Sequence, residues 1–311
     1  MHSGKVIAAK KIISSHIHRT PILRSRLLNK IANSQLFFKC ESLQKAGAYK
    51  IRGATNAILN LTTEEREKGV VTHSSGNFAQ ALSLAANLLG IPAYIVMPSN
   101  APKVKKAGVI EYGGHIIECE PTLEAREATA AEIVQTKKAT FIHPSNDIDV
   151  IYGQGTACLE LLEDHTGVDI IVCPVGGGGL IAGSCLAVND MNLNCTVIGA
   201  EPFEVDDAYR SLISKQIETN QTTNTIADGL KTQLGDKNFP IILDHVDSII
   251  RVTEEEIVDA MKLFWQYTKV IIEPSSAVTL AAVLREKLVF QDKKVGIILS
   301  GGNVDLQNLP F

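Results

Sequence analysis

The sequence has no block of basic residues, no closely spaced cysteine pair and no long apolar run, and each absence excludes a class of protein. Lysine and arginine are scattered and the formal net charge is -4, so the positive surface of a nucleic-acid binder is not expected. The six cysteines form no C-x-x-C motif, and we interpret them as buried thiols of a reducing compartment. The longest stretch without Asp, Glu, Lys or Arg, 69–102, contains prolines and amides, which excludes a membrane-spanning helix. The N-terminus lacks a signal-peptide pattern, so we expect a cytoplasmic protein.

What the chain does have is a regular alternation of apolar strands with helical segments. Its 311 residues, 45% of them hydrophobic, can form one large or two moderate cores. Strands are predicted at 35–40, 70–72, 93–97, 115–117, 140–142, 169–173, 195–200 and 294–299. Helices are predicted at 5–16, 51–61, 79–89, 123–135, 254–267 and 275–285, with further helices beginning near Pro102 and Leu180. This alternation predicts an α/β fold with parallel or mostly parallel sheets flanked by helices.

A run of four glycines, Gly176 to Gly179, lies between a buried strand and a helix. Glycines allow positive backbone dihedrals, so successive amide groups can converge on an anion beside the positive end of the helix. The run therefore indicates a phosphate-binding turn. The pattern Gly177-x-Gly179-x-x-Ala182 also fits a dinucleotide fingerprint, with Glu201 as the ribose-binding acid, and the glycines alone leave this alternative open.

Lys50 and two further polar turns favour a different cofactor. Ser74-Ser75-Gly76-Asn77 and Ser300-Gly301-Gly302-Asn303 each follow a predicted strand, where their side chains can meet at one edge of a sheet. A lysine that forms an imine, a phosphate turn and a polar partner for the ring nitrogen are what pyridoxal phosphate requires. A nicotinamide enzyme would leave Lys50 and Ser300 without a role.

The stretch Glu41 to Asn56 resembles the serine racemase and serine/threonine dehydratase family of fold-type II pyridoxal-phosphate enzymes. The turns 74–77, 153–156, 176–179, 227–229 and 300–303 match further family motifs, and Glu201-Pro202 with Asp206-Asp207 is most similar to the eukaryotic-type serine racemase branch. The resemblance implies a two-domain, tryptophan synthase β-like fold. Its large pyridoxal-phosphate-binding domain would comprise 1–60 and 146–311, and its small domain 61–145.

The resemblance also implies a role for individual residues. Lys50 would be the Schiff-base lysine and general base, with Tyr49 beside the cofactor ring, Asn77 on its phenolic oxygen and Ser300 on its nitrogen. Gly176, Gly177, Gly178 and Gly179 would bind the phosphate, and Ser74, Ser75, Gly76 and Asn77 the substrate. Ser75 matches the group that re-protonates the opposite face during racemisation, although a turn hydroxyl contacting only the substrate carboxylate is the alternative.

A divalent cation is a second expectation from the resemblance. Glu201, Asp207 and a backbone carbonyl near Val205 would supply hard oxygen ligands for Mg²⁺, Mn²⁺ or Ca²⁺. A homodimer is expected as well, and ATP activation, known in some racemase relatives, cannot be read from these residues.

Two departures from the family pattern leave the substrate open. Ala48 stands where relatives have serine two residues before the lysine, and Phe78 stands where many relatives have histidine. The expected reaction is racemisation of serine, or dehydration of serine or threonine to a 2-oxo acid and ammonia, with 3-hydroxyaspartate dehydration as the alternative. A nicotinamide-dependent oxidoreductase and a non-catalytic ligand-sensing homologue remain as alternatives of other classes.

Overall fold

The computed structural model describes residues 2–311 and contains two separate β-sheets. The strands of the larger sheet are β1 (Ile22–Leu23), β2 (Gln35–Cys40), β7 (Ile170–Pro174), β8 (Thr196–Pro202), β9 (Val246–Val252) and β10 (Lys294–Leu299). They lie in the order β1, β2, β10, β7, β8, β9, and every neighbouring pair is parallel except β1 with β2. The central strands β7 and β10 are almost entirely buried, as expected of a parallel sheet covered on both faces.

The smaller sheet has four parallel strands. These are β3 (Val70–His73), β4 (Ala93–Pro98), β5 (His115–Cys119) and β6 (Thr140–Phe141), in the order β5, β4, β3, β6. All four lie between residues 61 and 145. On that ground we propose a small domain of residues 61–145 and a large domain of residues 1–60 and 146–311.

Fourteen α-helices connect and cover the strands of the described chain, residues 2–311. They are α1 (Lys5–Ile13), α2 (Arg26–Ala32), α3 (Lys50–Asn60), α4 (Thr63–Lys68), α5 (Asn77–Leu88), α6 (Lys103–Glu111), α7 (Leu123–Lys137), α8 (Ile148–Asp164), α9 (Gly179–Asp190), α10 (Asp207–Ser214), α11 (Phe239–His245), α12 (Glu254–Thr268), α13 (Pro274–Arg285) and α14 (Lys287–Phe290). None of them is long and apolar enough to cross a membrane.

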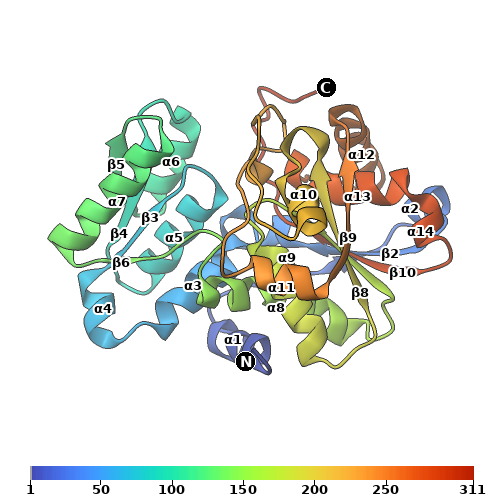
Figure 1. The fold of residues 1–311 in the computed structure, drawn as a ribbon, viewed down its shortest axis with the longest axis horizontal. Coiled ribbons are helices and arrows are strands. Elements are labelled where there is room, and N and C mark those ends of the chain that lie inside the picture. The colour runs from blue at the N-terminus through green and yellow to red at the C-terminus, as the bar shows by residue number, and fades with distance from the viewer. Residues whose placement is uncertain (1) are drawn as a thin grey trace.

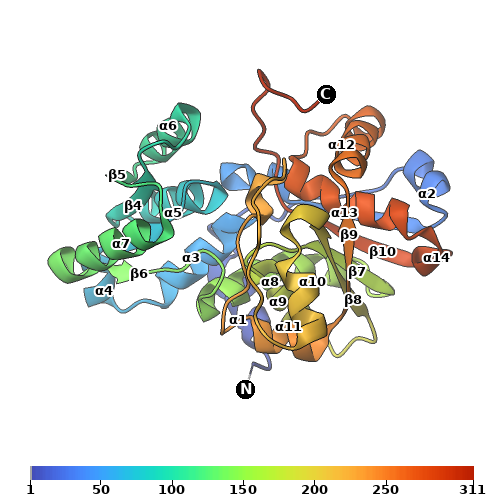
Figure 2. The same cartoon turned by 45° about the horizontal axis from the view of Figure 1, so that its top comes forward.

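Figure 1 shows the smaller sheet with α4, α5, α6 and α7 at one end of the molecule and the larger sheet at the other. Helix α3 lies between them, and the same separation is visible after the rotation in Figure 2. Lys50 is the first residue of α3. The predicted lysine therefore belongs to the helix that lies between the two sheets.

The predicted strands and helices are all present, and the mostly parallel α/β fold is confirmed. The helix predicted over 5–16 ends at Ile13, and the prediction missed the strands β1 and β9 and the helices α2, α4, α8, α10, α11 and α14. Helix α8 contains Gly153 and Gly155, which suggest a break in a sequence but here allow close contact between helices. A Cβ on Gly153 would lie 2.6 Å from the Cα of Gly53 in α3.

Candidate active site

A pocket of about 580 Å³ lies between the two sheets and contains the predicted cofactor and substrate residues. Its walls combine the start of α3, the turn before α5, the turn before α9 and the end of β10. The predicted residues that line it are Tyr49, Lys50, Ser74, Ser75, Gly76, Asn77, Gly176, Gly177, Gly178, Gly179 and Ser300. Three predicted residues, Glu201, Val205 and Asp207, lie outside it.

Lys50 is held at the pocket wall by its backbone neighbours and by one hydrogen bond. Its Nζ donates to the carbonyl oxygen of Pro144 (3.0 Å) and lies 5.1 Å from the ring centroid of Tyr49 and 5.8 Å from that of Phe78. Burial lowers the pKa of Lys50 to about 8, while the nearby Glu273 acts in the opposite direction. A substantial fraction of the amine is therefore neutral at mildly alkaline pH, which a nucleophilic or basic lysine requires.

The stretch before Lys50 pairs with the turn after β10, which brings together two segments that lie far apart in the sequence. The Tyr49 amide donates to the carbonyl of Ser300 (2.9 Å), and the Gly302 amide donates to the carbonyl of Gly47 (2.9 Å). Ala48 and Gly301 form an isolated antiparallel bridge. The hydroxyl of Ser300 lies 3.1 Å from that of Ser276. These contacts fix Ser300 relative to Lys50 within the same pocket.

The glycine turn has the geometry of an anion site. Gly178 has φ 78° and precedes α9, so the turn leads directly into the positive end of that helix. The amide groups of Gly176 to Gly179 donate to no acceptor among residues 2–311, and these residues face the pocket. A ligand phosphate would satisfy such amides.

Asn77 belongs to a polar network whose carboxylate was not predicted from the sequence. Its Nδ2 donates to both carboxylate oxygens of Glu273 (3.0 and 3.1 Å), and its Oδ1 accepts from Asn303 Nδ2 (3.0 Å). Burial, with Asp228 as a further cause, raises the pKa of Glu273 to about 7. The signal for Glu273 in the sequence was a single acid at the end of an apolar stretch, just before the proline that opens α13.

The wall formed by the smaller sheet carries further polar residues that the sequence did not single out. His143 Nδ1 accepts from the amides of Ser145 (3.2 Å) and Asn146 (2.8 Å), so the proton of its neutral ring is on Nε2. Burial and the neighbouring His73 lower the pKa of His143 to about 4. Arg126 also lines the pocket, and no carboxylate among residues 2–311 forms an ion pair with it. This cation is available to a ligand.

Glu201 and Asp207 lie together beside the start of α10. Glu201 accepts from the amides of Ala208 (3.2 Å) and Tyr209 (3.0 Å), and Asp207 accepts from Asn220 Nδ2 (2.8 Å) and the Leu234 amide (3.1 Å). Burial raises the pKa of both carboxyls, that of Asp207 to about 6, and the charge of Asp207 raises the pKa of Glu201 further. Glu201 does not line the pocket that the glycine turn faces, which does not suit a ribose-binding acid.

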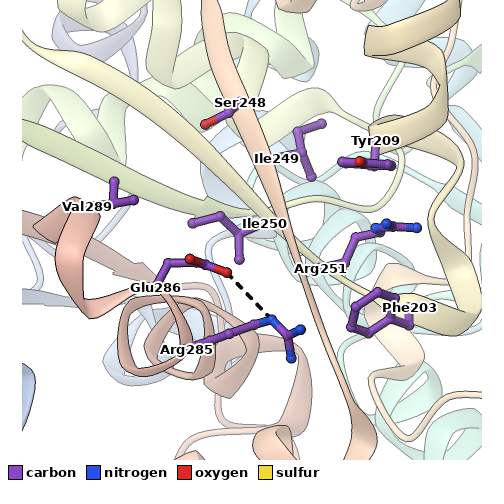
Figure 3. A pocket seen from close by; sticks show the side chains of 9 residues that line it. All are labelled: Phe203, Tyr209, Ser248, Ile249, Ile250, Arg251, Arg285, Glu286 and Val289. Atoms are coloured by element: carbon purple, nitrogen blue, oxygen red, sulfur yellow. Dashed lines mark ion pairs between the residues drawn. The ribbon is translucent and has the colours of Figure 1, made fainter.

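A second cavity, of about 300 Å³, lies along the edge strand β9. Figure 3 shows Arg251 between Tyr209 and Phe203, with its guanidinium 3.8 Å and 4.8 Å from their ring centroids. Arg251 also pairs with Asp206 (2.8 Å), and Arg285 pairs with Glu286 (3.8 Å). Both cations are therefore occupied, and the cavity contains no nucleophile comparable to Lys50.

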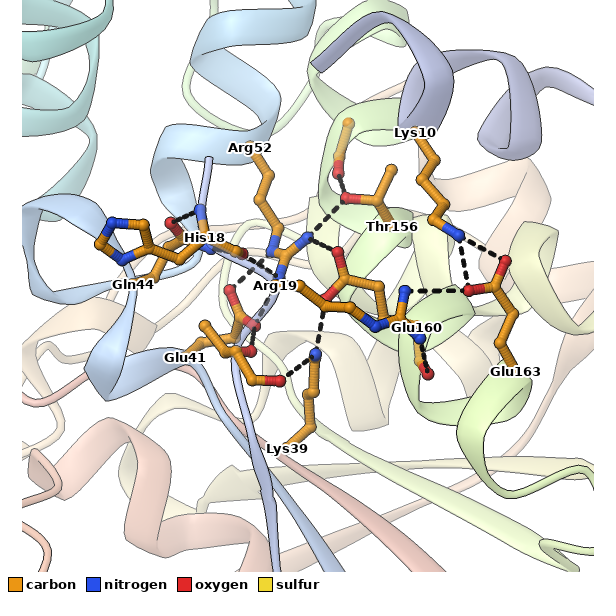
Figure 4. A network of polar contacts seen from close by, with 12 residues as sticks. Lys10, His18, Arg19, Lys39, Glu41, Gln44, Arg52, Thr156, Glu160 and Glu163 are labelled. Carbon is orange, nitrogen blue, oxygen red and sulfur yellow. Dashed lines mark hydrogen bonds and ion pairs between the residues drawn. The ribbon is translucent and has the colours of Figure 1, made fainter. Parts of the chain in front are cut away.

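Beneath α3 a buried cluster of four charges supports the start of this helix (Figure 4). Arg52 donates from Nε to Glu41 (2.7 Å) and from Nη1 to Glu160 (2.8 Å), and Lys39 donates to Glu160 (2.5 Å). All four side chains are at most 3% exposed. Two cations and two anions balance, so the cluster buries no net charge.

Known proteins match this fold over nearly its full length. The chain is 50% identical to a serine racemase of Dictyostelium discoideum over 307 residues, which cover 97% of this chain and 94% of the relative. It is 48% identical to a beta-hydroxyaspartate dehydratase of Paracoccus denitrificans over 306 residues, covering 98% and 97%. The structure of maize serine racemase superposes with a TM-score of 0.95 at 47% identity, covering 97% of this chain and 94% of that one.

A model of the pyridoxal-phosphate dependent enzyme family matches residues 13–301. This match and the three relatives confirm the resemblance inferred from the sequence motifs, and they favour pyridoxal phosphate over a nicotinamide cofactor. The pocket agrees with that cofactor, because its free glycine amides suit a phosphate and Lys50 suits an aldehyde. The chain belongs to the pyridoxal-phosphate dependent enzymes.

Proposed function

We propose that the protein racemises serine, dehydrates serine or threonine, or does both, with pyridoxal phosphate as its cofactor. The observation that carries the proposal is Lys50, whose amine of lowered pKa shares one pocket with a phosphate-binding turn and with Ser300. The bound cofactor supplies an aldehyde for the substrate amine and an electron sink that makes the α-proton removable. The relatives named serine racemase support the substrate class.

Each residue of the pocket has its own role in the proposed reaction. Lys50 removes the α-proton as a neutral amine, and burial favours that form because it lowers the pKa of Lys50 to about 8. Asn77 binds the phenolic oxygen of the cofactor ring, Ser300 binds the ring nitrogen, and Tyr49 lies beside the ring. Ser74, Ser75 and Gly76 bind the substrate carboxylate at the turn before α5, where Ser75 lines the pocket. Ser75 delivers a proton to the opposite face when the product is the D-amino acid.

A second candidate function is dehydration of 3-hydroxyaspartate. Arg126 favours it, because an unpaired guanidinium in the pocket matches the second carboxylate of such a substrate. The beta-hydroxyaspartate dehydratase among the relatives supports the same reading. Serine and threonine have no second carboxylate, and their α-carboxylate is assigned to the turn before α5.

One assay separates these candidates. The holoenzyme is incubated with L-serine, D-serine, L-threonine or 3-hydroxyaspartate, and pyruvate, 2-oxobutyrate, oxaloacetate and the serine enantiomers are measured. Lys50→Ala should abolish every product, and Ser75→Ala should stop racemisation. Arg126→Met should raise the KM for 3-hydroxyaspartate far more than the KM for serine. Turnover of any substrate by Lys50→Ala would refute the mechanism, and absence of all products in the wild type would favour a ligand-sensing role.

We also propose that Glu201, Asp207 and the backbone carbonyl of Val205 hold a structural divalent cation. No group of three or more His, Cys, Asp or Glu side chains suited to a metal occurs within the described range 2–311, so waters would complete the shell. Two buried carboxyls with raised pKa values fit a cation, because its charge would offset their repulsion. Chelation should lower activity and thermal stability without releasing the cofactor, and added Mg²⁺, Mn²⁺ or Ca²⁺ should restore both. Full activity after chelation would refute this site.

We further propose a cytoplasmic homodimer that binds neither nucleic acid nor membranes. The six unpaired cysteines and the scattered basic residues support this location and these exclusions, while the dimer rests on the family resemblance. Sedimentation equilibrium would test the dimer, and turnover measured with and without ATP would test nucleotide activation.

A further inference from the structure

Asn238 is fully buried directly behind the glycine turn and joins three loops. Its Nδ2 donates to the carbonyl oxygens of Gly177 (2.8 Å) and Ser145 (3.1 Å), and its Oδ1 accepts from the amide of Gly235 (3.1 Å). Asn238 is not among the residues that line the pocket. It can therefore affect a ligand only through the loops that it holds.

The three hydrogen bonds connect the two parts of the site that would hold the cofactor, the glycine turn and the segment that positions Lys50. Pro144, whose carbonyl accepts from Lys50, immediately precedes Ser145, and Gly177 belongs to the turn with the free amides. Ser145 also packs on that turn, because a Cβ on Gly177 would lie 2.3 Å from its Oγ. One side-chain amide thus sets the position of the glycine turn relative to the anchor of Lys50.

The bond to Gly177 also determines which groups of the turn face the ligand. In a planar trans peptide the C=O of one residue and the N–H of the next point in opposite directions, so the Gly177 carbonyl held from behind leaves the Gly178 amide directed toward the pocket. Gly178 requires the left-handed conformation (φ 78°), and a Cβ there would lie 2.7 Å from Asn238 Oδ1. The turn and Asn238 are therefore packed against each other without intervening space.

We propose that Asn238 is a positioning residue that orients the amides of Gly176 to Gly179 toward the cofactor phosphate and fixes their distance from Lys50. This inference rests on the proposed role of the turn as the phosphate site. It predicts a defect specific to the phosphate group, because Asn238 contacts the turn and the Pro144–Ser145 segment but not Lys50 itself.

The test compares pyridoxal phosphate with pyridoxal, which has the same aldehyde and ring but no phosphate. The full chain is freed of cofactor and titrated with each compound, and the absorbance of the resulting imine is followed. Borohydride reduction of a separate sample traps the adduct and identifies Lys50 as its site. In Asn238→Asp the shape is kept, but the carboxylate cannot donate to either carbonyl and brings a negative charge behind the turn. Loss of two hydrogen bonds predicts roughly a tenfold or larger rise in the dissociation constant for pyridoxal phosphate, with less change for pyridoxal.

Asn146→Asp is the matched control. Asn146 is the neighbour of Ser145 and bonds to the Lys237 amide (2.9 Å) and to Asp236 (2.7 Å), but not to the glycine turn. The control adds the same charge nearby and should keep the preference for pyridoxal phosphate over pyridoxal. Asn238→Ser, which retains one donor, should give an intermediate preference and serves if the aspartate variant does not fold.

An equal loss of affinity for both compounds in the Asn238 variants would overturn the proposal, because it would indicate a general structural role. Unchanged affinity for pyridoxal phosphate would overturn it as well. A wild-type protein without any preference for the phosphate would instead refute the phosphate site itself, and so distinguishes failure of the proposed function from failure of this inference.

Discussion

Replacing Glu160 by glutamine tests whether the buried charge cluster beneath α3 stabilises the fold. Glu160 accepts from Nη1 and Nη2 of Arg52 (2.8 and 2.9 Å) and from Lys39 (2.5 Å), and it is 2% exposed. The substitution keeps the size of the side chain but removes one of two negative charges. Arg52 and Lys39 then face Glu41 alone, which leaves one uncompensated positive charge inside the protein.

The expected magnitude follows from burial. Removing one partner of a buried ion pair costs about 3–5 kcal/mol, because the remaining charge has lost both water and counter-ion. For a protein of this size 1 kcal/mol shifts the melting temperature by roughly 2 °C, so the variant should melt roughly 6–10 °C lower. Lys39→Met combined with Glu160→Gln restores the balance of charge and should recover part of that loss.

Glu163→Gln provides the control on the same helix. Glu163 also has two cationic partners, Lys10 (2.6 Å) and Arg19 (3.1 Å), but its side chain is 31% exposed. An exposed pair contributes about 0–1 kcal/mol, so this variant should melt within roughly 2 °C of the wild type. Figure 4 shows both carboxylates with their partners.

Thermal unfolding of the cofactor-free protein, followed by circular dichroism, measures all the variants. Burial acts to raise the pKa of Glu160, but its bonds to Arg52 outweigh this and lower the pKa below 4.5. The stability that Glu160 contributes is therefore complete above pH 4.5 and is lost as the pH falls through the lowered pKa. Equal losses in the Glu160 and Glu163 variants, or a Glu160 loss independent of pH, would refute the reasoning.

Two other sites give further predictions. The pKa of Lys50 is lowered to about 8, so cofactor capture by the cofactor-free protein should accelerate as the pH rises through 8, whereas an ordinary lysine would require pH 10.5; stopped-flow absorbance measures this rate. Glu273 raises the pKa of Lys50, so Glu273→Gln should move that profile to lower pH, and an unchanged profile would exclude the electrostatic link. Gly178→Ala should destabilise the protein more than Gly90→Ala. Both residues have left-handed backbones (φ 78° and 70°), which cost alanine about 1–2 kcal/mol in either place. Of these two positions, only Gly178 has neighbouring atoms that an added Cβ would meet. Equal melting temperatures of the two alanine variants would show that the turn can relax.

The residues of the pocket could be predicted where a local motif carries the chemistry. Each predicted residue stands next to a strand or helix that the spacing of apolar residues reveals in the sequence. These residues all line one pocket, and they are Lys50, the serines and asparagine of the turn at 74–77, the glycine run and Ser300. Glu273, Arg126 and Asn238 have no such motif. Glu273 is a lone acid after an apolar stretch, whereas Arg126 and Asn238 stand beside other charged residues, and nothing in these segments distinguishes them from ordinary solvated polar residues.

The sequence by itself therefore predicted the mostly parallel α/β fold and the motif residues that line one pocket, because glycine turns and strand periodicity depend on neighbouring residues. Only the tertiary structure decided the pKa values of the pocket residues and which side chain holds the glycine turn. The lowered pKa of Lys50, the raised pKa of Glu273 and the support of the glycine turn by Asn238 depend on burial and on partners far apart in the chain. Such effects arise only when distant segments exclude water together, which no local pattern encodes.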